Sequence, residues 1–155
     1  VLFFPLFLNA NAPMGLKASK PLPRLPVPEG MTRICVAGFG ISHHTGRARR
    51  IADGIASVHP EKYETWYYFD TFGFRPEFLD SVKAELSEEQ RKKFADHKSS
   101  PFCWLERSDG TKNALGGRDR LCDWVRETFK DDERDESFLS LTREEPTRQW
   151  KEVKF

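Results

Sequence analysis

The feature that most constrains the fold is a helical pattern placed between two strand-like runs. Residues 32–39 (TRICVAGF) form an apolar run with β-branched residues, which is typical of a buried strand. Apolar residues then recur at helical spacing between 43 and 59, and the aromatic run 63–70 (YETWYYFD) is typical of a second strand. This order predicts parallel strands joined by a right-handed crossover.

The rest of the chain predicts two helices, a hairpin and a last helix. Apolar positions over 78–86 favour a helix, and Ser87 with Gln90 forms a capping pattern for a short helix that ends near His97. Residues 102–107 and 111–117 favour strands joined by an Asp-Gly turn, and a last amphipathic helix ends near Phe129. We therefore expect an α/β fold of order β-α-β-α-β-β-α over residues 32–129, with a four-stranded mixed sheet.

Two segments flank this domain. Residues 1–31 begin with an apolar run and continue with five prolines between 13 and 28, while residues 130–155 are polar without a sustained period. We expect both segments to be extended arms that dock on other protein subunits rather than on their own domain. The residues expected to dock are Phe3, Phe4, Leu6, Phe7, Phe138, Leu139, Trp150 and Phe155.

A proline opens the third predicted strand and two glycines close the fourth. This layout resembles that of glutaredoxins, and more closely the glutaredoxin-like domain that precedes the dehydrogenase in certain malate-dehydrogenase-like proteins. The likeness rests on CVAG (35–38), HKSSP (97–101) and LGG (115–117). It implies a thioredoxin-like fold, a cis Pro101, and a groove for a glutathione-type ligand. The groove residues would be Ser42, Ser100, Pro101, Gly116, Gly117 and Asp119.

The chain departs from that family at the redox position. The place of the reactive cysteine falls on Ser42, and the second position of a CxxC pair falls on Thr45. Thiol–disulfide exchange requires a thiolate, which a serine hydroxyl does not replace at neutral pH. The chain's cysteines, Cys35, Cys103 and Cys122, stand elsewhere. We therefore expect no catalytic residue and no enzyme activity, and we interpret the groove as vestigial.

The remaining signals favour no cofactor chemistry. The net charge of +1 gives no electrostatic footprint for nucleic acid, and the three cysteines are too few for a disulfide framework. His43 and His44 are neighbours at a helix start and would face different ways, so we expect no metal site. The basic run 46–50 (GRARR) is expected to form the solvated face of the first helix.

These observations predict a non-catalytic accessory or structural subunit of a larger assembly. The apolar start, which ends in Ala10-Asn11-Ala12, favours peripheral membrane contact at an organelle complex, such as a thylakoid photosystem in the chloroplast or a mitochondrial respiratory complex. A ciliary or cytoskeletal assembly is an alternative suggested by the resemblance. A further alternative is a glutathione-binding or thiol-redox protein of the glutaredoxin type. The main hypothesis requires no cofactor, with glutathione as the alternative ligand.

Overall fold

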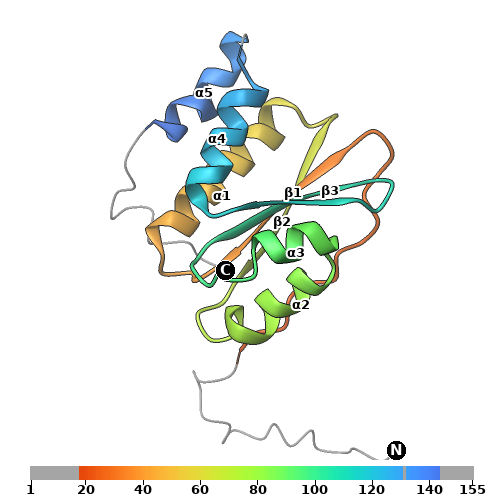
Figure 1. Cartoon of the computed structure of the whole chain (residues 1–155). Coiled ribbons are helices and arrows are strands. Elements are labelled where there is room, and N and C mark those ends of the chain that lie inside the picture. The colour runs from red at the N-terminus through yellow and green to blue at the C-terminus, as the bar shows by residue number, and fades with distance from the viewer. Residues whose placement is uncertain (1–17, 131, 144–155) are drawn as a thin grey trace, which may run out of the picture.

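The computed structural model describes residues 18–130 and 132–143. They form an α/β fold in which helices cover both faces of a four-stranded mixed sheet (Figure 1). The strands are β1 (Thr32–Gly38), β2 (Tyr63–Phe69), β3 (Phe102–Arg107) and β4 (Lys112–Gly116). The helices are α1 (His43–Val58), α2 (Leu79–Ala84), α3 (Glu88–Lys93), α4 (Arg118–Thr128) and α5 (Glu136–Leu139), with a π-helical turn at Phe74–Phe78 and 3₁₀ turns at Glu133–Asp135 and Ser140–Thr142.

The sheet has the strand order β2-β1-β3-β4. Strand β1 is parallel to β2 and antiparallel to β3, and β3 is antiparallel to β4, with an irregularity between Cys103 and Trp104. The predicted mixed sheet of four strands is confirmed, and so is the predicted cis Ser100-Pro101 bond. A second cis bond, Arg75-Pro76, precedes α2.

The sheet separates two hydrophobic clusters because side chains alternate along each strand. Helices α1, α4 and α5 cover one face, where Ile34, Val36 and Leu105 are buried (Figure 1). Helices α2 and α3 cover the second face, where Trp66 and Trp104 belong to an aromatic cluster. Helices α2 and α3 have only six residues each. Ser87 is the N-cap of α3, so a new helix begins there and α2 does not continue into it.

The outer edge of β4 is covered by one side chain of α3. The Gln90 Nε2 amide donates to the Lys112 carbonyl at 3.0 Å, and Gln90 Oε1 accepts from the Ala114 N–H at 2.6 Å. The Gln90 side chain therefore pairs with β4 as the peptide group of a neighbouring strand would.

The segment after α4 packs on its own domain. Phe138 is fully buried and Leu139 is 7% exposed, both in the cluster under α1 and α4. The prediction that Phe138 and Leu139 dock on another subunit was therefore wrong. The error has a physical cause: three short helical turns carry too few residues to show a period, and one inserted aromatic ring is enough to hold them.

The basic run 46–50 also differs from its prediction. Arg47 is only 4% exposed, and its Nε donates to the Leu141 carbonyl at 2.7 Å. This residue faces the C-terminal segment rather than solvent. The apolar periodicity of α1 does not reveal this contact, because the carbonyl acceptor belongs to a segment far along the chain.

The N-terminal segment also lies on its own domain. Residues 18–30, named the strap here, run along the second face of the sheet beside α2 and α3 (Figure 1). Asp70 Oδ2 accepts from both the Ser19 N–H and the Ser19 hydroxyl, and Arg24 pairs with Glu85 and Glu106. For these residues the prediction of an arm docked elsewhere was wrong. Phe3, Phe4, Leu6, Phe7, Trp150 and Phe155 lie outside the described residues.

Candidate functional site

The positions predicted for a redox pair lie at the start of α1 and are held by hydroxyl groups. Ser42 is the N-cap of α1, and its Oγ accepts the Thr45 N–H at 3.5 Å. The Thr45 hydroxyl lies 2.9 Å from the Ser100 hydroxyl, and Ser100 Oγ also accepts the Phe39 N–H at 2.7 Å. These bonds join the end of β1, the start of α1 and the loop before Pro101 into one hydrogen-bonded junction.

Gly38 allows this junction to close. A Cβ at this position would lie 2.4 Å from Ser100 Oγ and 2.6 Å from Thr45 Oγ1, and 3.1 Å from the Pro101 Cα. Contacts this short do not occur between a methyl group and a hydroxyl oxygen. The last residue of β1 therefore has to be glycine if the two hydroxyls are to meet across it.

A cleft of about 400 Å³ opens between the loop before Pro101 and the start of α4. Gly117 is the N-cap of α4, and Gly116 has a positive φ of 106°, which favours glycine. A Cβ at Gly116 would lie 3.1 Å from the Phe94 ring. The cleft is lined by His44, His97, Ser99, Ser100, Gly117, Arg118, Asp119 and Arg120.

The two histidines of this cleft are biased towards their neutral forms. Burial, and then the neighbouring Arg118 charge, lower the pKa of His44, whose Nδ1 accepts from Arg118 Nη1 at 2.6 Å. Burial also lowers the pKa of His97, which outweighs its bond to the Ser99 carbonyl. Because His97 Nε2 donates to that carbonyl at 2.9 Å, the same nitrogen does not serve as a base for the Ser99 hydroxyl.

The charged groups of the cleft favour an anionic ligand. Arg118 and Arg120 both line it, and the Asp119 carboxylate is 81% exposed and pairs with Arg118 Nη2 at 2.7 Å. Arginine guanidinium groups beside the exposed N–H groups of a helix start suit a carboxylate. The cleft offers hydrogen-bond donors and positive charge, and its Ser100 hydroxyl is occupied by the junction.

The cysteines are buried and inaccessible, and none of them lines the cleft. Cys35 and Cys103 are fully buried and Cys122 is 3% exposed. Burial raises the pKa of all three thiols. A reactive thiol needs the opposite environment, with a lowered pKa and exposure.

Five predicted groove residues surround the cleft or its junction: Ser42, Ser100, Pro101, Gly117 and Asp119. Gly116 lies one residue away and shapes the turn instead. Sequence reasoning missed Arg118 and His97 as lining residues. Both residues are neighbours of the groove motifs in the sequence: Arg118 directly follows Gly117, and His97 begins HKSSP. Their position next to these motifs could have identified them as lining residues.

Two features are absent from residues 18–130 and 132–143. These residues contain no group of three or more histidine, cysteine or acidic side chains placed to hold a metal ion. The same part of the chain has no helix of the length and hydropathy needed to cross a membrane.

Comparison with known proteins adds no family to these observations. No protein-family model matches the chain, and no similar sequence is found among curated proteins.

Proposed function

We propose that this chain is a thioredoxin-like domain without thiol chemistry, which acts by binding as an accessory subunit of a larger protein assembly. The strand order β2-β1-β3-β4, the parallel β1–β2 pair and the antiparallel β3–β4 hairpin support this fold assignment. The buried cysteines support a role that uses no thiol.

One observation carries the proposal: the junction formed by Ser42, Thr45 and Ser100. At the redox position of the resembled family, this chain has hydroxyls that bond to the backbone and to each other. Hydroxyls at these positions do not take part in thiol–disulfide exchange. A site without thiols is suited to holding a partner rather than to exchanging disulfides.

The substitution Ser42→Cys tests this assignment. A thiol at the start of α1 is expected to ionise below the ordinary cysteine pKa of about 8.5 and to form a mixed disulfide with oxidised glutathione. Mass spectrometry and the pH dependence of alkylation measure both. Ser87→Cys is the matched control, because Ser87 caps the short helix α3 away from the cleft.

Three results would contradict the proposal. If Ser42→Cys reacts no faster than Ser87→Cys, the thioredoxin-like site assignment fails. If the unsubstituted chain reduces disulfides above background, the non-catalytic assignment fails. Migration of the native protein as a species no larger than its own 18.0 kDa would argue against an accessory subunit.

Glutathione binding is the second candidate, and the cleft beside Arg118 favours it. A carboxylate of the tripeptide would meet Arg118 and the N–H groups at the start of α4. Calorimetric titration with reduced glutathione tests this, and Arg118→Ala should weaken binding by about tenfold or more because one charge-assisted bond is lost. Equal affinities in the two proteins would contradict it.

The identity of the assembly is proposed from the sequence alone. The apolar run at residues 1–12 favours an organelle membrane complex, a photosystem or a respiratory complex, over a ciliary assembly. Cross-linking from residues 1–31 in the native complex would identify the neighbouring subunits. Cross-links only to ciliary or cytoskeletal proteins would overturn this preference.

A further inference from the structure

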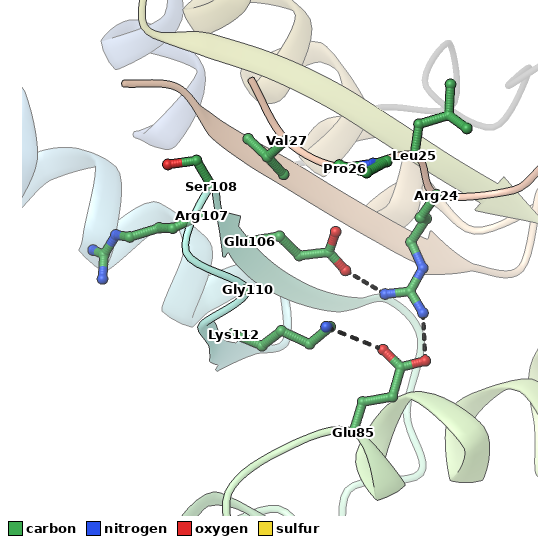
Figure 2. A pocket seen from close by; sticks show the side chains of 10 residues that line it. All are labelled: Arg24, Leu25, Pro26, Val27, Glu85, Glu106, Arg107, Ser108, Gly110 and Lys112. Atoms are coloured by element: carbon green, nitrogen blue, oxygen red, sulfur yellow. Dashed lines mark hydrogen bonds and ion pairs between the residues drawn. The ribbon is translucent and has the colours of Figure 1, made fainter. Parts of the chain in front are cut away.

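Arg24 attaches the strap to the centre of the second face. Its guanidinium carbon lies 5.5 Å from the ring centroids of both Trp66 and Trp104. Nη1 pairs with Glu106, and Nη2 donates to Glu85 Oε1 at 2.6 Å (Figure 2). Two indole rings and two carboxylates thus surround one guanidinium group.

This set of four residues, Trp66, Trp104, Glu85 and Glu106, is named the cage here. Glu106 is only 5% exposed, and its carboxylate also accepts from Trp104 Nε1 at 3.0 Å and Arg33 Nη1 at 3.1 Å. These bonds come from the sheet itself, so the carboxylate is oriented independently of the strap. A planar guanidinium reaches two carboxylates while contacting indole rings, which a lysine ammonium does less well.

The strap is held mainly through Ser19 and Arg24. No backbone–backbone hydrogen bond joins residues 18–27 to the domain in the described structure. The apolar side chains of Leu22 and Leu25 are 74% and 70% exposed, so they do not fix the strap to the sheet. Prolines at 21, 23, 26 and 28 favour an extended conformation without internal hydrogen bonds. In these respects the strap resembles a bound peptide that is tethered to its own receptor.

The surface under the strap keeps an unpaired hydrogen-bond donor and an open cleft. Trp66 is 9% exposed, yet its Nε1 is a buried donor without an acceptor among the described residues. A cleft of about 430 Å³ remains between the strap and the β3–β4 hairpin, lined in part by Val27, Glu85, Glu106 and Lys112 (Figure 2). A buried N–H group without an acceptor costs free energy, so Trp66 beneath Arg24 leaves one hydrogen bond unmade.

We propose that the cage is a binding site for a peptidyl arginine, filled in cis by Arg24 and in trans by an arginine from an extended, proline-flanked segment of a partner protein. The partner segment displaces the strap, and its chemistry is that of residues 21–29 (PLPRLPVPE). Glu85 and Glu106 bind the guanidinium of the incoming arginine, while Trp66 and Trp104 pack against it. This mode uses the preformed extended conformation of a proline-rich segment.

The full-length Arg24→Ala variant tests the proposal, with the synthetic peptide PLPRLPVPE as the probe. We expect calorimetry to show one peptide bound per chain, and the tryptophan fluorescence to change. Replacing the peptide's arginine with lysine should weaken binding by about tenfold or more. The unsubstituted chain should bind more weakly by about tenfold or more, since the tethered Arg24 competes. Adding Glu106→Gln to Arg24→Ala should abolish binding.

Two results would overturn the proposal: no peptide binding by a folded Arg24→Ala chain, or equal affinity for the arginine and lysine peptides. If Arg24→Ala does not fold, Arg24→Lys provides the second test, because it keeps a positive charge between Glu85 and Glu106. The arginine peptide should bind this variant in preference to the lysine peptide. A folded Arg24→Lys chain that binds neither peptide would also overturn the proposal.

Discussion

At the scale of single residues, Gly54 decides how the C-terminal segment packs. It lies in the C-terminal half of α1 against Phe138, and a Cβ there would lie 2.8 Å from the Phe138 Cβ. Glycine inside a helix normally costs stability relative to alanine. Here the missing methyl group allows α5 to approach α1, so the local cost is offset by the burial of Phe138.

We therefore predict that Gly54→Ala destabilises the protein. The gain in helix propensity of about 1 kcal/mol is opposed by overpacking of about 1–3 kcal/mol, which leaves a net loss of about 1 kcal/mol. Urea denaturation measures this difference. Ser57→Ala, on an exposed position of α1, should change stability by less than about 0.5 kcal/mol. A more stable Gly54→Ala chain would contradict the predicted clash.

At the scale of elements, the segment from 133 to 142 is held to α1 and α4 by a few polar contacts around Phe138. Asp135 Oδ1 lies 2.6 Å from His59 Nε2, and the His59 ring stacks on Phe129 at 5.5 Å. Arg126 Nη1 donates to the Thr142 carbonyl at 2.9 Å. This segment is therefore part of the folded domain, which extends the domain beyond the boundary predicted at residue 129.

Asp135→Ala should loosen this segment. Asp135 is 3% exposed, and its loss leaves a His59 nitrogen without its partner, at a cost of about 1–3 kcal/mol. Hydrogen exchange should accelerate across residues 133–142 and stay slow in β1 and β3. Glu133→Ala, an exposed neighbour, serves as the control. Uniform acceleration over the whole chain, or none, would show that the pair does not hold this segment in particular.

At the scale of the whole molecule, the strands and long helices were predictable from the sequence. The packing of the strap and of the segment 133–142 on the domain was not. Strands β1 and β2 are apolar or aromatic runs of seven residues and helix α1 carries a helical period, so the sequence identifies them with bounds close to those observed. Ser100-Pro101 was located by resemblance. The role of Arg24 was missed, and the partner of Phe138 was wrongly predicted. Each residue acts alone, from a segment without a period, on partners far away in the sequence.

Glu106 links three parts of the molecule, because its carboxylate pairs with Arg24 of the strap and with Arg33 of β1, which also binds Glu64 of β2. Burial alone would raise the pKa of Glu106. The Trp104 N–H bond and Arg24 outweigh it, so the pKa lies below the usual 4.5. A lowered folded-state pKa stabilises the fold above the unfolded value, and this contribution is lost as the pH falls through the folded value.

We predict that the melting temperature falls as the pH is lowered below about 4.5, and that Glu106→Gln shows a smaller fall over that range. The variant should also be less stable at pH 7, by about 3–5 kcal/mol, because Arg24 and Arg33 lose a buried partner. Calorimetric melting across pH 3–7 measures both effects, with Glu133→Gln as the exposed control. Parallel pH profiles for Glu106→Gln and the unsubstituted chain would contradict the assignment.

The Gln90 side chain on the edge of β4 has a consequence for solubility. An uncovered edge strand offers its N–H and carbonyl groups to any extended chain, which is how sheets of separate molecules join into aggregates. By occupying the Lys112 carbonyl and the Ala114 N–H, Gln90 removes two pairing positions from a strand that has only five residues. One amide group on a neighbouring helix thus protects the sheet against growth from molecule to molecule at this edge.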